Sequence, residues 1–528
     1  MSERDRYDDD ELRRVLSRRA FLGQCAVGAA TLTVAPLLNA CGGPPSVAIA
    51  PAPGSEMQKG YFDTNFGLSD ELLRAVMGEA MSRGGDWADI YAQHQQSTYV
   101  GFEDDIVNQA NTSIDLGVGI RVIAGDQTGY AFSEDLTPES LKAAARTAAS
   151  IANSGAKTAP VDLTRQALKG YYDTDYDWQN VELEGITSLL DQINAKTKGA
   201  DASVARVKVW LQSSQSRILV VDSDGWVSFD NQPLTRLFLT TVMEKNGVTQ
   251  SNAYNVSARD GMSFYTEARV SRVIEEALAR TSILFEAKDA PAGELPVVLA
   301  AGSSGILLHE AIGHGMEADF NRKGISIFAD RIGKKVADET VTIVDSGIDP
   351  RLRGAINVDD EGSLPQSTKL VENGILKSYL HDRISAKHYG VAPTGSGRRE
   401  SFRHPVLPRM RATYMLPGPH AKDEIIGTVK KGIYCISFTN GQVDIGGGDY
   451  SFYVKNGFLI EDGKLTAPIK DVNIIGNGPE SLARITMVGD DFAMDEGGWT
   501  CGKGGQSVPV SLGLPTVLVS GITVGGAA

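Results

Sequence analysis

Residues 307–320 read LLHEAIGHGMEADF, and within this stretch His309 and His314 lie on either side of Glu310. Two histidines and a carboxylate on one helix indicate a metal site, but these histidines are five residues apart. Each residue of an ideal α-helix advances about 100°, so side chains five positions apart differ by about 140° and do not converge on one ion. The sequence therefore predicts that any helix here is irregular.

Two kinds of irregularity would bring the histidines together. A π-type turn, with hydrogen bonds from residue i to i+5, realigns side chains at this spacing and recurs at functional sites. Alternatively, the helix could loosen at Gly313, because AIGHG places a glycine on each side of His314 and glycine relaxes the backbone. We expect the helix to start with Ser303 or Ser304 as its N-cap and to be irregular between Ala311 and His314.

Zinc suits these residues, because neutral imidazoles bind it well and a catalytic zinc site combines three protein ligands with one open position. Glu310 would then be the general base that takes a proton from a zinc-activated water. The two histidines leave the third ligand open. The candidates are Glu317, Asp319, His381, His388, His404 and the cysteines.

Length and composition indicate a folded protein of two or three domains. The chain has 528 residues and is 42% apolar, which is enough for a substantial core. Its 57 glycines and its many short alternating runs favour a structure rich in turns and strands. The net charge of -15 argues against a nucleic-acid partner, because phosphate binding needs clustered Lys and Arg.

Residues 1–40 have the features of a twin-arginine export signal. Arg18 and Arg19 precede an uncharged run of about 16 residues, which is too short to span a membrane as a helix. The run ends in LNAC, which resembles a lipobox, so we expect either lipid attachment at Cys41 or cleavage nearby that leaves a soluble protein. Residues 41–60 are predicted to be a flexible linker. The protein is therefore expected to be periplasmic or lipid-anchored on the envelope.

Residues 61–290 are predicted to form an N-terminal α+β domain with antiparallel sheets, built as one structural unit or two. Ser69 is a helix N-cap, and proline takes the first helical position after Thr137. Alternating runs between these helices predict strands with a hairpin turn at residues 125–129.

The same pattern then repeats within this domain. Helices are predicted over residues 181–199 and 263–287, the second from its amphipathic periodicity. Strands between them should turn at Asp224-Gly225 and at Asn246-Gly247.

Residues 291–528 are predicted to form a β-rich C-terminal domain that carries the zinc site. Short strands dominate after about residue 340. Their turns are expected at Asn373-Gly374, Asn456-Gly457 and Asp462-Gly463. The fold class is therefore α+β.

Six segments of this domain follow one another in the order HEAIGHGMEADFNRKG, DDEGSLPQ, PTGSGRRESF, PRMRATYMLPG, GQVDIGGG and WTCGKGGQSVPVSLGLPT. In this order they resemble the TldD branch of the TldD/PmbA metalloprotease family. The resemblance runs from about residue 60 to the C-terminus. The family motif is His-Glu-x-x-x-His, so the five-residue spacing matches it.

The resemblance implies that the third zinc ligand is the cysteine of the Cys-Gly-Lys segment, which is Cys501. A thiolate binds zinc strongly, and zinc keeps it deprotonated. Lys503 would steady the negative sulfur or contact a substrate. The alternative is a disulfide between Cys435 and Cys501, formed in an oxidising envelope, which would remove a ligand from the site.

One residue near the site would also stabilise the oxyanion formed when a peptide carbonyl is attacked. The segments that match the family offer His404 and Tyr414 as the favoured candidates, because both can donate a hydrogen bond, and Arg398, Arg399 and Arg411 as further ones.

The residues and the resemblance together predict a zinc-dependent metallopeptidase that hydrolyses unfolded or flexible peptides. Family members act as two-fold assemblies of a TldD-like and a PmbA-like subunit that lacks the zinc motif, so this chain is expected to be the catalytic partner of a heterodimer or a homodimer. Two alternatives remain at this point: a non-catalytic envelope lipoprotein that binds peptides, and a zinc amidohydrolase, such as a deformylase, that acts on peptides without being a protease.

Overall fold

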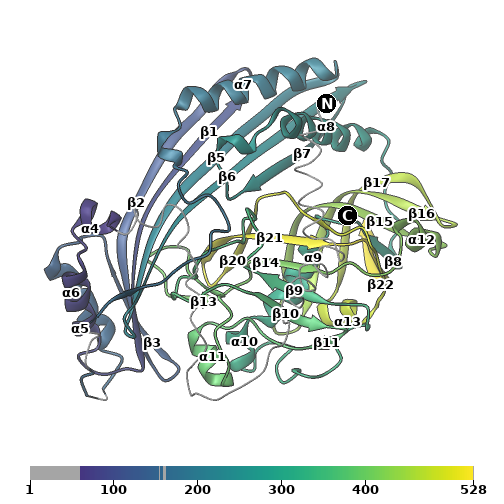
Figure 1. Cartoon of the computed structure of the whole chain (residues 1–528). Coiled ribbons are helices and arrows are strands. Elements are labelled where there is room, and N and C mark those ends of the chain that lie inside the picture. The colour runs from purple at the N-terminus through teal and green to yellow at the C-terminus, as the bar shows by residue number, and fades with distance from the viewer. Residues whose placement is uncertain (1–59, 154, 158–161, 527–528) are drawn as a thin grey trace, which may run out of the picture.

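The computed structural model describes residues 60–153, 155–157 and 162–526. The predicted export signal, Cys41 and nearly all of the predicted linker lie outside these residues. The described chain has the predicted α+β fold, in which strands pair mostly antiparallel (Figure 1). Among the described residues, no helix is both long and apolar enough to cross a membrane.

The strands of the N-terminal half form one seven-stranded sheet with the order β3-β2-β1-β5-β6-β4, and β7 pairs with β6. The long strands curve as an arch over the C-terminal half (Figure 1). The strands are β1 (Trp87–Glu103), β2 (Ile106–Ala124), β3 (Gln127–Ser133), β4 (Thr164–Arg165), β5 (Val204–Asp222), β6 (Trp226–Lys245) and β7 (Val248–Ala258). The predicted turns between these strands are confirmed, and the first of them lies at Gly125-Asp126.

Two groups of helices cover the two ends of one face of this sheet (Figure 1). Ile90 of β1 packs against the first group, at one end of the strand, and Val100 of β1 packs against the second group. The two residues are an even number of positions apart, so their side chains lie on the same face of the sheet. Ser69 and Thr137 cap their helices as predicted. The first group is α4 (Tyr61–Phe66), α5 (Asp70–Ala80) and α6 (Pro138–Ala149); the second is α7 (Leu183–Ala200) and α8 (Glu267–Ser282).

The C-terminal half contains two larger sheets. One has the order β11-β10-β9-β14-β21-β19, with β20 on β21; the other has the order β17-β16-β15-β8-β22-β18 and is closed by pairing of β17 with β22. The first comprises β9 (Ile343–Ser346), β10 (Ser367–Glu372), β11 (Ile375–Leu376), β14 (Ala412–Met415), β19 (Ala493–Met494), β20 (Trp499–Lys503) and β21 (Gln506–Leu514). The second comprises β8 (Gly293–Leu299), β15 (Lys431–Val443), β16 (Asp449–Glu461), β17 (Lys464–Asn477), β18 (Ile485–Val488) and β22 (Val517–Gly526).

Short elements connect these sheets. They are α9 (Gly305–Leu308), α10 (Ala318–Arg322), α11 (Arg383–Tyr389), α12 (Lys422–Gly427), α13 (Gly478–Ala483) and the small pair β12 (Gly397–Arg398) and β13 (Leu407–Pro408).

The predicted turn at Asn456-Gly457 is wrong, because both residues lie inside β16. The pairing of β16 with β15 is irregular here, and the Asn456 side chain is buried and accepts a hydrogen bond from Ser437 Oγ at 2.8 Å. A Cβ at Gly457 would lie 2.5 Å from the Tyr434 carbonyl oxygen. Asn456 therefore lies at an irregularity of the strand pairing, and Gly457 allows the two backbones to approach closely. The predicted turns at residues 373–374 and 462–463 are confirmed.

A buried network of charges joins the arch to the C-terminal half. Arg121 Nε lies 2.6 Å from Asp89 Oδ2, and Arg121 Nη2 lies 2.8 Å from Glu361 Oε1. Arg399 Nη2 contacts the other oxygen of Asp89 at 2.8 Å. All four side chains are fully buried. Removing one partner of such a network leaves the others charged and without water, which costs more than the pair itself contributes.

We therefore expect Asp89→Asn to lower the free energy of unfolding by about 3–5 kcal/mol, because Arg121 and Arg399 both lose their shared carboxylate. Chemical denaturation followed by far-UV circular dichroism measures this loss. The matched control is Asp105→Asn, which removes an exposed partner of Lys198 and should leave the midpoint nearly unchanged. Equal midpoints for the two variants would contradict a stabilising role for the network.

Candidate metal centre

The helix that carries the two histidines is irregular, as predicted. After α9 the chain forms a π-helix over His309–Gly313 and then a 3-10 turn over His314–Met316. Ser304 occupies the N-cap position, but its hydroxyl donates to the Cys435 carbonyl oxygen at 3.5 Å and does not cap the helix. The wider π-turn brings side chains five residues apart to the same side.

The glycines beside His314 have a different purpose from the one expected. Gly313 has helical backbone angles (φ -60°, ψ -47°), so it needs no special backbone freedom. A Cβ at Gly313 would lie 2.0 Å from Met410 Sδ, and one at Gly315 would lie 2.7 Å from Phe328 Cδ2. These glycines therefore allow close packing of the helix, which lies in the core between the two C-terminal sheets.

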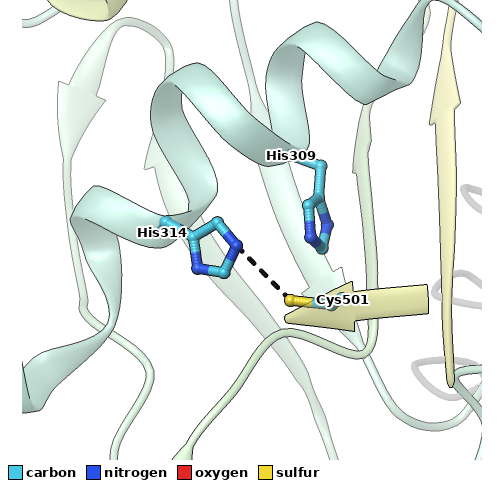
Figure 2. Close-up of side chains that lie close together, drawn as sticks. All are labelled: His309, His314 and Cys501. Atoms are coloured by element: carbon cyan, nitrogen blue, oxygen red, sulfur yellow. Dashed lines mark hydrogen bonds between the residues drawn. The ribbon is translucent and has the colours of Figure 1, made fainter. Parts of the chain in front are cut away.

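The histidines and Cys501 converge. Cys501 lies on β20, and its sulfur is 3.3 Å from Nε2 of His314 (Figure 2). The donor atoms of His309, His314 and Cys501 all lie within 4.8 Å of one another, and all three residues are buried. Tetrahedral zinc with ordinary bond lengths would separate a nitrogen and a sulfur ligand by about 3.6 Å. The three residues therefore fit a single zinc-sized ion.

His309 supplies a second indication of a metal site. Its side chain is 1% exposed, and neither ring nitrogen has a hydrogen-bond partner among the described residues. A buried polar group without a partner is costly. A metal ion bound by one of these nitrogens would remove most of that cost. Imidazole and thiolate are both common zinc ligands, and three protein ligands leave the fourth position of a tetrahedral zinc open.

Glu310 lies at the edge of this cluster. Its carboxylate oxygen is 3.8 Å from Nε2 of His314, which is the nitrogen that faces Cys501. Its side chain is 19% exposed, so it reaches both the ligands and solvent. This is a suitable position for a group that exchanges protons next to a metal.

Glu317, which the sequence offered as a ligand, lies instead behind His314. Its carboxylate is 3.0 Å from Nδ1 of His314 and 3.0 Å from Nζ of Lys503. Lys503 also contacts Asp319 Oδ1 at 2.7 Å and the Pro408 carbonyl oxygen at 3.0 Å. Lys503 therefore contacts carboxylates and does not steady the sulfur.

Arg409 takes the role expected of Lys503. It is fully buried, and its Nη2 donates to the Cys501 sulfur at 3.2 Å and to the Cys501 carbonyl oxygen at 2.6 Å. Its Nη1 donates to the Gln506 carbonyl oxygen at 3.3 Å. One guanidinium thus stabilises negative charge on the sulfur and fixes the strand that carries it. Sequence reasoning missed this residue, although it lies in the segment PRMRATYMLPG.

The charges of the site favour a negative sulfur. Burial alone would raise the pKa of Cys501, but His309 and His314 hold it well below its usual value. Burial alone would lower the pKa of His314, but Glu317 and Cys501 raise it well above the usual value. Burial would likewise raise the pKa of Glu317, but Lys503 and His314 lower it to about 2. Glu317 is therefore charged at neutral pH, and its neighbours favour the thiolate form of Cys501.

The other predicted site residues lie elsewhere. His404 is in a turn, where its Nδ1 is 3.1 Å from Ser401 Oγ. Tyr414 packs in β14 beside Phe492, and burial raises its pKa strongly. No hydrogen bond in the described part of the chain joins either residue to His309, His314 or Cys501. Arg398, a further candidate, is buried and donates to the carbonyl oxygens of Met410 and Pro509, both at 2.6 Å.

Cys435 and Cys501 are both free, so the structure does not contain the alternative disulfide. Cys435 is buried in the core cluster around the helix. Burial raises its pKa, which suits an apolar core residue.

We expect Gly313→Ala to destabilise the protein by about 1–3 kcal/mol, because the new methyl group overlaps Met410 inside a packed core. Thermal unfolding of both variants measures the effect against Gly185→Ala. Gly185 lies in α7 with open space around its Cβ position, so alanine there should be neutral or slightly stabilising. The packing explanation fails if both substitutions behave alike.

The chain is similar to known proteins over most of its length. Three family models match: PmbA/TldA metallopeptidase domain 1 at residues 88–152, the central domain at 176–285 and the C-terminal domain at 292–526. The "Metalloprotease TldD homolog" of Buchnera aphidicola is 37% identical over 467 residues, which are 87% of this chain and 96% of that protein. The "Zinc metalloprotease TldD homolog" of Saccharolobus solfataricus is 33% identical over 60% of this chain and 68% of its own.

Solved structures share the fold. TldE from Thermococcus kodakarensis matches with a TM-score of 0.67 and 19% identity, over 86% of this chain and 99% of its own. At that identity the likeness concerns the fold alone. Sequence similarity over 96% of the Buchnera relative, together with the three family models, carries the further conclusion: the chain belongs to the PmbA/TldA metallopeptidase family.

Proposed function

We propose that this protein is a zinc-dependent metallopeptidase that hydrolyses unfolded or flexible peptides, with His309, His314 and Cys501 as zinc ligands and Glu310 as general base. The observation that carries the proposal is the convergence of three buried donors beside one partly exposed carboxylate. The donor set favours zinc, and one relative bears the name of a zinc metalloprotease.

Bound zinc would polarise the peptide carbonyl and lower the pKa of water. The residues of the chain supply the remaining parts of the reaction. Glu310 accepts a proton from the attacking water and delivers it to the leaving amine, since its carboxylate faces the same side as the ligand nitrogen of His314. Arg409 holds the sulfur of Cys501 as a thiolate.

The strand that carries Cys501 supports an extended peptide as the substrate. β20 and β21 are joined by a two-residue turn, Gly504-Gly505, in which both residues have positive φ. In such a hairpin the closing pair, Lys503 and Gln506, is hydrogen-bonded, so the backbone groups of Thr500 and Gly502 point away from β21.

Among the described residues, β20 pairs with β21 alone, and Thr500 and Gly502 are exposed. A peptide added antiparallel or parallel to this free edge would pass directly beside Cys501. Strand addition uses backbone hydrogen bonds, which explains a preference for unfolded chains over particular sequences.

Location and assembly form the second part of the proposal. The twin-arginine pattern around Arg18 and Arg19 supports export, and Cys41 would be the lipid anchor or lie near the cleavage site. We infer a dimer, either of two copies or with a PmbA-like subunit, in which this chain is the catalytic partner because it keeps His309, Glu310 and His314.

Substituting the general base tests the chemistry. We expect Glu310→Gln to retain zinc and to lose about 100-fold or more of its activity on casein or flexible peptides, because the amide cannot accept the proton. Zinc content by plasma mass spectrometry and peptide turnover are measured on the same samples, with Cys501→Ser as the variant that should lose metal. Full activity in zinc-loaded Glu310→Gln would contradict the proposed hydrolysis with Glu310 as general base.

The same assay separates the remaining alternatives. A non-catalytic lipoprotein would bind peptide without turnover in any variant. An amidohydrolase that is not a protease would release formyl or other acyl groups and leave internal peptide bonds intact, which mass spectrometry of the products reveals.

A scan of N-methylated peptides tests the strand-addition mode. Methylation of a backbone nitrogen removes one donor, so kcat/KM should fall about five- to tenfold at alternate positions of the peptide and change little at the positions between them. The effect should recur at every second peptide residue, because only Thr500 and Gly502 direct their backbone N–H and C=O groups away from β21. A uniform effect along the peptide would contradict binding at the β20 edge.

A further inference from the structure

We propose that Glu317 and Lys503 are positioning residues that set the metal affinity of the site without touching the metal. The proposal rests on the metallopeptidase function proposed above. It concerns a buried ion pair between the helix side and the strand side of the site, where Nζ of Lys503 lies 3.0 Å from Glu317 Oε2.

Glu317 fixes the orientation of one ligand. The carboxylate is fully buried, and it accepts from Nδ1 of His314 at 3.0 Å. A proton held on Nδ1 leaves the lone pair on Nε2, the nitrogen that faces Cys501. A carboxylate in this position fixes the ring and raises the basicity of the nitrogen that binds the metal.

The backbone of Glu317 is also held in place. Its N–H donates to the His314 carbonyl oxygen at 3.2 Å, and its own carbonyl oxygen accepts from Nδ2 of the buried Asn321 at 2.9 Å. These two hydrogen bonds fix the backbone from which the Glu317 carboxylate extends toward His314.

The ammonium group of Lys503 is surrounded by protein partners. Its Nζ donates to Asp319 Oδ1 at 2.7 Å and to the Pro408 carbonyl oxygen at 3.0 Å, and it forms an ion pair with Glu317 Oε2 at 3.0 Å. Its side chain is 5% exposed, and Nζ lies 4.2 Å from the centre of the Phe320 ring. These contacts indicate that Lys503 holds neighbouring parts of the site in position and does not bind a substrate.

The ion pair links the two elements that supply ligands. Lys503 and Cys501 are two residues apart on β20, so their side chains lie on the same face of the strand. Glu317 follows His314 on the helix side. A shift of β20 relative to the helix would move the sulfur away from Nε2 of His314 and would stretch the contact between Lys503 and Glu317.

Metal affinity, measured by chelator competition with Zn2+ and with Co2+, tests the proposal. We expect Lys503→Met and Glu317→Gln each to weaken binding about 10- to 100-fold, the range found when partners of metal ligands are removed. The visible spectrum of the Co2+-loaded protein should also change, because it reports the coordination of sulfur and imidazole.

The double variant Glu317→Gln/Lys503→Met separates positioning from a merely structural role. Lys503→Met leaves the buried Glu317 carboxylate without its cation, and Glu317→Gln leaves Lys503 with Asp319 as its ion-pair partner. The double variant removes both charges of the Glu317–Lys503 pair. Its melting temperature should therefore recover relative to at least one single variant, while its metal affinity stays low.

Lys455→Met is the matched control. Lys455 also forms an ion pair, with Asp471 at 2.8 Å, but it lies on β16, and among the described residues no hydrogen bond or ion pair joins it to His309, His314 or Cys501. Its loss should leave metal affinity unchanged.

The outcomes are distinct. If the unsubstituted protein binds neither metal, both the proposed function and this proposal are overturned. If it binds metal and the Lys503 and Glu317 variants bind equally well, the positioning role alone is overturned. If the double variant recovers both stability and affinity, the ion pair is structural and the proposal is wrong.

Discussion

The π-helix is the constraint on which the site depends. Two histidines five residues apart face one ion only when the helix is widened between them, and a widened helix needs neighbours that hold it in that form. The neighbours here are the two C-terminal sheets, which pack around the helix in one core cluster. α13 adds a direct backbone contact, because a Cβ at Gly478 would lie 1.9 Å from the Ala311 carbonyl oxygen. The ligand geometry is therefore a property of the core.

The third candidate ligand, Cys501, comes from a strand almost two hundred residues away, and a different set of contacts fixes it. Arg409 bonds both the sulfur and the carbonyl oxygen of Cys501, and it also bonds Gln506 on the adjoining strand of the hairpin. The hairpin is thus held at the end where it carries the sulfur. Among the described residues the outer edge of β20 has no strand partner, so in the proposed function one strand would offer its side chain to the metal and its backbone to a peptide.

Local rules of sequence predicted much of the fold. N-caps at Ser69 and Thr137 and most two-residue turns were correct because the residues themselves set the backbone there. Asn456-Gly457 failed because tertiary contacts override the turn preference of Asn-Gly. The histidine spacing predicted the irregular helix from geometry alone. Cys501, by contrast, was reached through family resemblance, since nothing local to β20 says that its sulfur faces two histidines.

The supporting residues of the site could not be assigned from sequence for a related reason. By residue type alone, Glu317 could bind the metal or hydrogen-bond to a residue that binds it. Only the fold shows that its carboxylate is hydrogen-bonded to Nδ1 of His314. Lys503 and Arg409 are both cations near Cys501 in space. Which of them bonds the sulfur depends on side-chain directions, and these follow from the packing of β13 and β20.

The segment from Arg398 to Arg409 explains how the N-terminal arch contributes to the metal centre. At one end Arg399 enters the buried charge network with Asp89, while at the other Arg409 donates a hydrogen bond to the Cys501 sulfur. Between them, the Glu400 carboxylate accepts from the Ser507 N–H at 2.7 Å. The side-chain amide of Gln506 accepts from the Glu400 N–H and donates to the Pro405 carbonyl oxygen. Because one short segment contacts the arch, the hairpin and the ligand, the arch helps to set the position of β20. The buried charge network is therefore connected to the candidate metal centre through this segment.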